Sequence, residues 1–481
     1  MITLENNMIY YRKFTVCIVL IAIFSGCTMG PDYVKPKMEV ASSFKEQEGW
    51  KVAQPKDDVS RDQWWSIFHD SVLDSLISQV AVSNQNILSA EASYRQAVAL
   101  VQQADASYYP TLNGNASAIR SKPASNLTNT LNYNPNYNTA YRGSLSASWI
   151  PDLWGSIKRS VEASKAGADS SYASIEAAKL SSQSLLAQDY YLIRFLDAKK
   201  ILLNETCKSY EQVLQLTKNQ YDAGIVTRSD VINAETQLKS TQVQSVDLDI
   251  QRAQYEHAIA ILIGKAPIEF SITPLPNVAL GDIPAVPLEI PSALLERRPD
   301  IASAERLVAQ ANAQIGVAEA AFYPSLTIAP TFGYQSTQLS NLLDTPARFW
   351  SIGPALAGPI FDGGLRKAQK DATIAAYDQS VAKYKQTVLT AFQQVEDNLV
   401  TLRTLENEFA LQSSVVNSAN DALQLAVNQY KAGIVNYINV SNAQNVALAN
   451  EINALNIQSL RFNSTIGLIV ALGGNWNSLH K

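Results

Sequence analysis

Two nearly identical stretches, 209 residues apart, constrain the fold of this chain more than any other feature. They are Asn219-Gln-Tyr-Asp-Ala-Gly-Ile-Val226 and Asn428-Gln-Tyr-Lys-Ala-Gly-Ile-Val435, which differ only at Asp222 and Lys431. Each lies between long, Pro-free segments rich in Ala, Gln and Leu, which are typical of helices. A Gly after such a segment favours a left-handed turn, so each stretch predicts the tip of a helical hairpin. A chance match between Ala-rich helices is the alternative, but a shared Tyr, Gly and Ile-Val pair in fixed register favour two true repeats.

The composition argues against several functions. Charged residues make up 17% of the 481 residues and the net charge is −5, so there is no basic surplus to attract nucleic acid. The three histidines, His69, His257 and His480, are scattered along the chain. The sequence contains no HExxH, no CxxC and no Gly-rich loop after a strand. We therefore expect no enzyme activity, no cofactor and no metal site.

The amino terminus has the pattern of an export signal. Arg12 and Lys13 precede the apolar run Phe14–Phe24, which is too short to cross a hydrocarbon core of about 30 Å. The run leads into Ser-Gly-Cys27, and small residues before a Cys resemble a bacterial lipobox. We expect cleavage before Cys27 and acylation of Cys27; a plain signal peptide with an incidental Cys is the alternative. Cys207 would then be the one free thiol.

Each half of the chain predicts a helix, two strands, a long helix, a tip and a further helix. One helical region is expected from Trp64 to about Ser107, followed by strands at about 111–150, where Tyr137 to Trp149 alternate between apolar and polar residues. The second pair of strands is expected at about 325–358. The expected boundaries are a signal peptide at 1–26, an arm at 27–62, a first repeat at 63–263, a Pro-rich segment at 264–299, a second repeat at 300–472 and a tail at 473–481.

The helix before each tip is unusually long. The segment from Ser156 to Tyr221 contains no Pro, and a helix of that length measures on the order of 100 Å. Its apolar residues follow a coiled-coil seam, which is interrupted by the polar residues Lys200 and Thr217. The segment that ends at Tyr430 shows a similar seam. Both seams need partners, so we expect other helices to pack against them.

The predicted strands also need partners. Each pair has one apolar face, and an open sheet in a membrane leaves backbone groups unsatisfied at several kcal/mol each. Bacterial barrels start at eight strands, so a chain with four strands must associate with further copies. Three copies would leave an open lumen. The predicted fold is mainly α: a long coiled-coil α-helical barrel plus four strands per protomer in a shared transmembrane β-barrel, with two internal repeats.

Several short motifs along the chain carry a family resemblance. They are Cys27 with Gly30-Pro-Asp-Tyr33, Trp64-Trp65, Trp154-Gly155, Glu296-Arg-Arg-Pro-Asp300 with Glu305, Tyr323-Pro-Ser-Leu326, Phe361-Asp-Gly-Gly364 and the two tips. In this order and spacing, the mature chain resembles the TolC-like outer-membrane efflux factors, in the lipoprotein branch found with resistance-nodulation-division pumps.

The resemblance implies a homotrimeric exit duct in the outer membrane of a Gram-negative bacterium. Such a duct is lipid-anchored, has a long periplasmic extension, and passes drugs or other toxic compounds from an inner-membrane pump and a periplasmic adaptor. The implied contacts with the adaptor are Ala223, Gly224, Ile225, Ala432, Gly433 and Ile434. Alternatives are the same duct serving metal-ion or type I protein export, or a structural coiled-coil envelope lipoprotein without a pore; the alternating strands argue against the latter.

The resemblance also implies a gate at the tips. In the family, the residue at the position of Tyr430 contacts the one at Asp230 and helps to close the tunnel. A second family lock needs an Arg where this chain has Val435, opposite Ser229, so that lock is expected to be absent. The acidic ring of the family falls on Asn439 and Asn442, which are uncharged. The alternative for Tyr430 is a core residue at the end of its helical seam.

Overall fold

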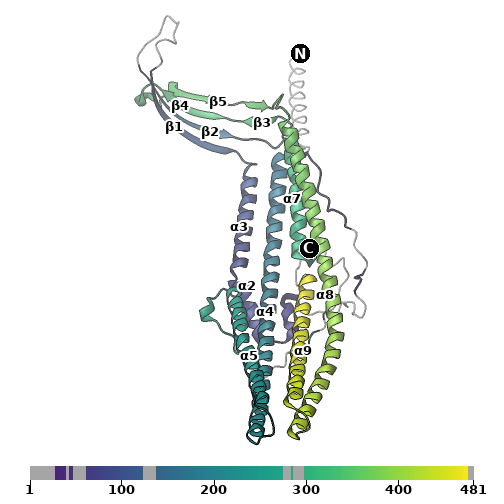
Figure 1. Ribbon diagram of the computed structural model, residues 1–481. Helices are drawn as coiled ribbons and strands as arrows, with labels where there is room; N and C mark the ends of the chain where they lie inside the picture. The colour runs from purple at the N-terminus through teal and green to yellow at the C-terminus, as the bar shows by residue number, and fades with distance from the viewer. Residues whose placement is uncertain are drawn as a thin grey trace. The chain divides into compact units, whose positions relative to one another are not determined.

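The computed structural model describes residues 28–38, 43–46, 61–122, 137–274, 283–284, 286 and 297–474 (Figure 1). The expected signal peptide and Cys27 lie outside the described residues. The chain forms two compact units. The first is made of Met1–Pro36, Tyr94–Ser170 and Ala304–Lys383, and the second of Lys37–Ser93, Ser171–Ser303 and Tyr384–Lys481. Each unit therefore draws residues from both repeats.

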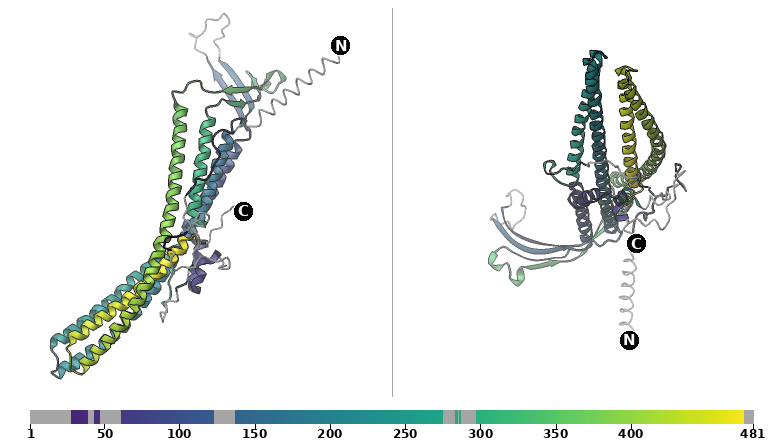
Figure 2. Two further views of the ribbon diagram at one scale, coloured as in Figure 1. Left: turned by 90° about the vertical axis from the view of Figure 1, so that its right-hand side faces the viewer. Right: turned by 90° about the horizontal axis from the view of Figure 1, so that it is seen from below.

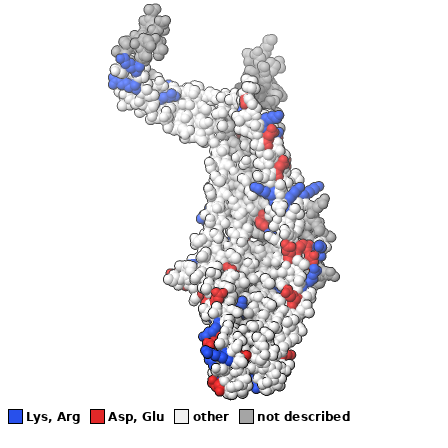
Figure 3. All heavy atoms as spheres, viewed as in Figure 1, with Lys and Arg blue, Asp and Glu red and all other residues white. Residues whose placement is uncertain are grey.

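The first unit contains an antiparallel sheet with the strand order β1-β2-β4-β5 and a two-stranded sheet, β3-β6 (Figure 1). The strands are β1 (Thr111–Ser121), β2 (Asn138–Ser148), β3 (Ser325–Ile328), β4 (Thr331–Ser336), β5 (Arg348–Ser351) and β6 (Pro354–Ala357). The register places Leu145 opposite Phe332 and Phe332 opposite Trp350. These three side chains are exposed, so the sheet carries apolar residues on an uncovered face. Figure 3 shows most of the visible surface over the strands free of charged atoms.

The second repeat contributes four short strands where two continuous ones were expected. Pro330 has no amide hydrogen to donate to a ladder and lies between β3 and β4. Pairing nevertheless continues across this break: the Ala147 amide donates to the Pro330 carbonyl at 3.0 Å, and Trp149 and Ile328 form a bridge. β3 and β4 therefore act as two parts of one strand beside β2. The other break, at Ile352-Gly353, separates β5 from β6.

The helices of the two repeats match in length. α4 (Ser156–Asp222) and α8 (Leu365–Lys431) each have 67 residues, and α5 (Arg228–Leu262) and α9 (Tyr437–Ala471) each have 35. The remaining long helices are α3 (Gln85–Ala106) and α7 (Pro299–Ala320). Along the described part of the chain, no helix combines the length and the apolarity that a bilayer crossing requires.

The region from Trp64 to Ser107 was expected to be one helical region, but it forms three separate helices. A 3-10 helix, η1 (Arg61–Phe68), is followed by α2 (Ser71–Ser83) and then by α3. Short polar side chains cause both breaks because they bind backbone groups locally. Asp70 accepts from the first amides of α2, and Asn84 accepts from Asn86 and Ile87 at the start of α3. The Asn84 amide also donates to the Leu262 carbonyl at 2.8 Å, which ties this junction to the end of α5.

The main core of the second unit joins α2, α4, α5, α8 and α9. Tyr191 of α4 stacks on Phe462 of α9, with ring centroids 4.6 Å apart. The start of α7 is attached to the same unit by Arg298, whose guanidinium donates to Gln394 of α8 at 2.7 Å and to the Ala471 carbonyl at 3.1 Å. The arginine of the Arg-Pro-Asp motif is thus a structural residue.

Candidate functional site

The two tips have the same backbone geometry. Gly224 has φ +76° and Gly433 has φ +73°, which is the left-handed region that Gly adopts without strain. The amide after each Gly donates five residues back, Ile225 to Gln220 at 2.8 Å and Ile434 to Gln429 at 2.9 Å. These are Schellman motifs, which end a helix and satisfy its last carbonyls. The repeated sequence therefore produces a repeated turn.

The ends of both hairpins are uncovered in the single chain. The expected adaptor contacts, Ala223, Gly224, Ile225, Ala432, Gly433 and Ile434, are all exposed. Ile225 and Ile434 are the large apolar members of this set. An exposed Ile beside an exposed Gly offers an apolar point with little side-chain bulk around it, which suits a protein contact.

The two hairpins meet close to the tips. A cluster of apolar side chains fills the space between them, from Cys207, Tyr210, Val213 and Leu214 of α4, Ala234 and Leu238 of α5, Tyr430 of α8, and Tyr437 and Val440 of α9. α5 and α9 are in contact, and Figure 2 shows the hairpins running side by side. We call this group the tip cluster. It packs hairpin α4–α5 against hairpin α8–α9 within one chain.

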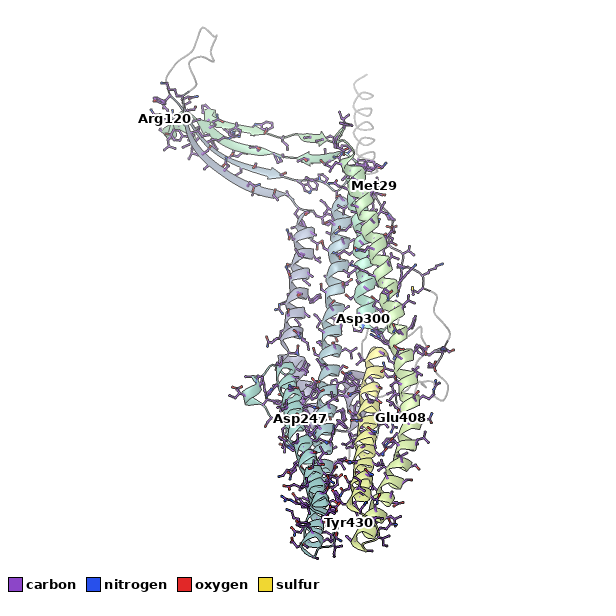
Figure 4. The ribbon with its side chains drawn as sticks, viewed as in Figure 1. Met29, Arg120, Asp247, Asp300, Glu408 and Tyr430 are labelled. Atoms are coloured by element: carbon purple, nitrogen blue, oxygen red, sulfur yellow. The ribbon has the colours of Figure 1, made fainter. Side chains whose placement is uncertain are left out.

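Tyr430, which is labelled near the tips in Figure 4, belongs to the tip cluster. Only 1% of its surface is exposed, and its hydroxyl donates to Thr217 Oγ1 of α4 at 2.9 Å. Thr217 in turn donates to the Val213 carbonyl. Burial raises the pKa of Tyr430, which the hydrogen bond to Thr217 opposes and the charge of Asp230 reinforces. The hydroxyl is therefore a neutral donor that links α8 to α4.

The expected partner of Tyr430, Asp230, is engaged elsewhere. Its carboxylate accepts from the Thr227 amide at 3.0 Å and from the Thr227 hydroxyl at 2.8 Å, which forms a capping box at the start of α5. The hydrogen bond that the resemblance implied between Tyr430 and Asp230 is thus replaced by one between Tyr430 and Thr217. Asp230 contributes to Tyr430 through its charge alone.

Further neutral hydrogen bonds join the two hairpins near Tyr430. The Tyr210 hydroxyl of α4 donates to the Gln444 carbonyl of α9 at 3.2 Å, and within α9 the Tyr437 hydroxyl donates to Gln444 Oε1 at 3.4 Å. Burial raises the pKa of Tyr210 to about 12, so its hydroxyl stays protonated. Gln237 of α5 donates to Asn445 of α9 at 2.7 Å. These links contain no ion pair.

The remaining predicted gate residues lie on the surface near the tips. Asn439 and Asn442 are exposed on α9, and the Asn439 amide donates to Asn436 Oδ1 at 3.0 Å. Val435 packs against the tip cluster, and Ser229 is exposed. The structure therefore brings Tyr430 and Val435 into one cluster, with Asn439 and Asn442 outside it.

Comparison with known proteins identifies the chain. A sequence model described as "Outer membrane efflux protein" matches residues 76–265 and 290–474, one stretch in each repeat. The chain belongs to the outer membrane efflux protein family. The resemblance drawn from the sequence motifs is confirmed.

Relatives of this efflux protein span almost its whole length. The probable efflux pump outer membrane protein TtgC of Pseudomonas putida is 30% identical over 467 residues, 94% of each chain. The cation efflux system protein CusC of Escherichia coli is 29% identical over 467 residues, 96% of this chain and 98% of CusC. The structure of the outer-membrane channel OprN matches with a TM-score of 0.87 and 26% identity, over 94% of this chain and all of OprN. The expected mainly helical fold with two repeats is confirmed.

The residues that follow Cys27 in this efflux protein are bound between α4 and α7. The buried Arg159 of α4 donates to the Met29 and Gly30 carbonyls and pairs with Asp32 at 2.7 Å. Asn312 of α7 donates to the Pro31 carbonyl at 2.9 Å, and the Tyr33 hydroxyl donates to Glu305. Met29 is labelled beside these helices in Figure 4. We call residues 28–33 and their partners the arm clasp.

The arm clasp explains motifs that the sequence alone left as a resemblance. A methyl group on Gly30 would lie 2.4 Å from the Gly316 Cα, and one on Gly155 would lie 2.9 Å from the Thr28 side chain. Gly30, Gly155 and Gly316 therefore leave room for the arm. Sequence analysis missed Arg159, Asn312, Thr217 and Gln444 as partners, although Thr217 was visible as a polar break in an apolar seam.

Proposed function

We propose that this outer membrane efflux protein forms a homotrimeric exit duct that is closed at its helical tips. The sheet supports the trimer: β1 and β5 are the outer strands of the order β1-β2-β4-β5, and unpaired edges are costly in a membrane. Three copies would bring twelve strands together in a shared barrel, above the minimum of about eight for bacterial barrels.

The observation that carries the proposed gate is the buried hydrogen bond from Tyr430 to Thr217. It joins hairpin α8–α9 to hairpin α4–α5 at the level of the tip cluster. A neutral buried hydrogen bond contributes about 0.5–1.5 kcal/mol net, and three copies act together in a trimer. Opening would separate the hairpins and break these bonds. The closed state would thus depend on neutral contacts and apolar packing.

The proposed partners follow from the uncovered tips and from the relatives. A periplasmic adaptor would bind the exposed apolar points at Ile225 and Ile434, and an inner-membrane pump would deliver cargo through it. TtgC is named for an efflux pump and CusC for cation efflux, so drugs, other toxic compounds and metal ions are the candidate cargo classes. We propose small toxic compounds as cargo, with metal-ion export as the second candidate.

The proposed anchor is an acylated Cys27 in the outer membrane of a Gram-negative bacterium. The short apolar run before Ser-Gly-Cys27 supports processing at this residue. The arm clasp supports it as well, because it binds the segment that begins one residue later.

The gate is tested by conductance of the purified full chain in planar lipid bilayers. Thr217→Val combined with Tyr430→Phe removes both hydroxyls with little change in volume. We expect this variant to open about tenfold more often than the unmodified protein, since loss of a few neutral bonds per trimer shifts the equilibrium by about 1.4 kcal/mol or more.

Tyr221→Phe is the matched control for this experiment. Tyr221 is the repeat equivalent of Tyr430, yet 43% of its surface is exposed against 1% for Tyr430. We expect Tyr221→Phe to leave the conductance unchanged. Equal conductance in all three proteins would contradict a gate built on Tyr430 and Thr217, and the absence of any channel activity would contradict the duct itself.

A further inference from the structure

The junction between strands and helices holds an aromatic contact inside each chain. The turn Pro151–Gly155, between β2 and α4, packs against Tyr323 and Pro324 at the end of α7. The Trp154 ring stacks on the Tyr323 ring with centroids 4.8 Å apart and an interplanar angle of 25°. The Trp154 indole also donates to the Pro324 carbonyl at 2.8 Å. The first repeat is thereby attached to the second.

The other repeat carries the same two segments without the contact. The turn Pro359–Gly364 precedes α8 as Pro151–Gly155 precedes α4, and Gly364 and Gly155 are both left-handed, with φ +91° and +75°. Tyr109 and Pro110 follow the end of α3 as Tyr323 and Pro324 follow the end of α7. Phe361 is 90% exposed and Tyr109 is 71% exposed, against 42% for Tyr323. The segments around Phe361 and Tyr109 are thus uncovered in one chain, whereas the equivalent segments around Trp154 and Tyr323 cover each other.

The strand order shows how a second copy would bring these segments together. Within the chain, β2 precedes the Trp154 turn and lies beside the broken strand β3–β4, which follows Tyr323; it pairs with β4, and the Trp149–Ile328 bridge extends this pairing to β3. By the same relation, the strand β5, which β6 continues up to the Phe361 turn, would pair with β1, the strand after Tyr109. β5 and β1 lie at opposite edges of the four-stranded sheet, so this pairing requires β1 of another copy. It preserves the antiparallel alternation of the sheet.

We propose that Ile360 and Phe361 of one chain dock on Tyr109 and Pro110 of a second copy. This interface repeats between chains the contact that Trp154 and Tyr323 make within one chain, and it rests on the proposed trimer. Phe361 lies three residues before its Gly and Trp154 one residue before, so the segments correspond without matching atom for atom. Exposed aromatic residues of this kind are typical anchors of protein interfaces.

Cysteine cross-linking of the full chain in detergent tests this interface. We expect Tyr109→Cys with Phe361→Cys, treated with a short bis-methanethiosulfonate, to give covalent dimers and trimers on a denaturing gel. Either single variant should remain monomeric, because the native Cys207 is buried. Trp154→Cys with Tyr323→Cys is the matched control, which should link within one chain and show no larger species.

Substitution provides a second measure that does not depend on the cross-linker. We expect Phe361→Ala and Tyr109→Ala each to lower the fraction of trimer that survives mild heating by about tenfold, with no further loss in the double variant, since both remove the same contact. Phe361→Leu should retain more trimer than Phe361→Ala.

The outcomes separate this inference from the proposed function. One outcome would overturn the interface and leave the duct intact. In it, the wild-type protein is a trimer and the control pair links, but Tyr109→Cys with Phe361→Cys stays monomeric on the gel. It would indicate that lipid covers Phe361. Additive losses of trimer in the double alanine variant would also overturn it. A wild-type protein without trimers would contradict the proposed duct as well.

Discussion

At the scale of single residues, position within the fold decides what a repeated residue does. Tyr221 and Tyr430 occupy the same place in two nearly identical stretches, yet only Tyr430 is buried and bonded to a neighbouring helix. The residue opposite Tyr430 is Thr217, whose repeat equivalent, 209 residues on, is Ala426. The hydrogen bond between Tyr430 and Thr217 therefore exists once per chain, although the tips exist twice.

Asp189 makes folding stability depend on pH. It lies in α4, is 7% exposed, and burial raises its pKa to about 6 from 3.8. Below about pH 4 the carboxyl is protonated in both the folded and the unfolded state, so it does not oppose folding. As pH rises from about 4 to about 6, the unfolded chain loses this proton more readily than the folded one, and the free energy of unfolding falls. We expect Asp189→Asn to stabilise the protein by about 1–3 kcal/mol at pH 7.5 and to have little effect at pH 4.

Thermal unfolding followed by circular dichroism in detergent would measure this effect at both pH values. Asp169→Asn, an exposed position on the same helix, is the matched control and should change neither midpoint. An Asp189→Asn variant with equal shifts at pH 4 and pH 7.5 would contradict the role of its ionisation.

Asn439 and Asn442 bear on ion selectivity. Both are exposed on α9 close to the second tip, where a three-fold ring of carboxylates would attract cations. We expect Asn439→Asp with Asn442→Asp to shift the reversal potential in a salt gradient toward the value for a cation-selective channel. Asn428→Asp, on the exposed surface of α8, makes the same chemical change outside the predicted ring. An equal shift in this control would contradict a ring of Asn439 and Asn442.

At the scale of elements, the arm clasp shows how a segment without regular structure is fixed by helices. Arg159, Glu305 and Asn312 are all buried, and each binds a group of the arm. Buried polar groups require partners, and the arm supplies one to each of these side chains. The clasp joins α4 of the first repeat to α7 of the second.

The arm clasp predicts that two similar glycine substitutions have different effects. A methyl group at Gly316 of α7 would lie 2.8 Å from the Met29 carbonyl, whereas one at Gly167 of α4 would meet the flexible end of Gln310 at 3.1 Å. Both changes favour the helix by about 1 kcal/mol. We expect Gly316→Ala to release the arm and lower the trimer yield, and Gly167→Ala to do neither.

A spin label on Val34→Cys reports the state of the arm, because Val34 is exposed and adjoins Tyr33. The spectrum should become more mobile in Gly316→Ala and remain as in the parent in Gly167→Ala. Identical spectra in the two variants would show that Gly316 is not needed for docking.

At the scale of the whole molecule, the two repeats are interleaved. Each compact unit contains residues from both halves of the sequence, and the strands of the two repeats pair through β2 and β4. The sheet that results still has two open edges. These edges are where the proposed further copies of the chain would pair.

We expect the full chain in detergent to be a trimer by native mass spectrometry. The mass of the chain should also show an acylated residue at Cys27 as the first residue. Cys27→Ser should impair delivery to the outer membrane more than trimer formation, because the predicted strands would still enter the membrane. A folded, stable monomer would contradict the edge argument, and an unmodified terminus elsewhere would contradict lipidation.

The repeats, the helical hairpins and the positions of their tips could all be predicted from the amino-acid sequence. Gly224 and Gly433 act through local backbone geometry, and long Pro-free segments rich in Ala, Gln and Leu favour helices. The alternation from Tyr137 to Trp149 likewise marked a strand because side chains alternate along any strand. Local preferences were sufficient for these features.

Only the tertiary structure decided which residues meet. Tyr430 is 213 residues from Thr217, and Arg159 is 130 residues from Met29, distances over which no local pattern specifies a contact. The family resemblance pointed to Asp230, but that carboxylate is closer in sequence to Thr227 and caps α5 instead. Asp230 binds Thr227 because a contact between residues three positions apart costs little chain entropy. The packing of the two hairpins places Thr217 next to Tyr430, so Thr217 accepts the hydrogen bond from Tyr430.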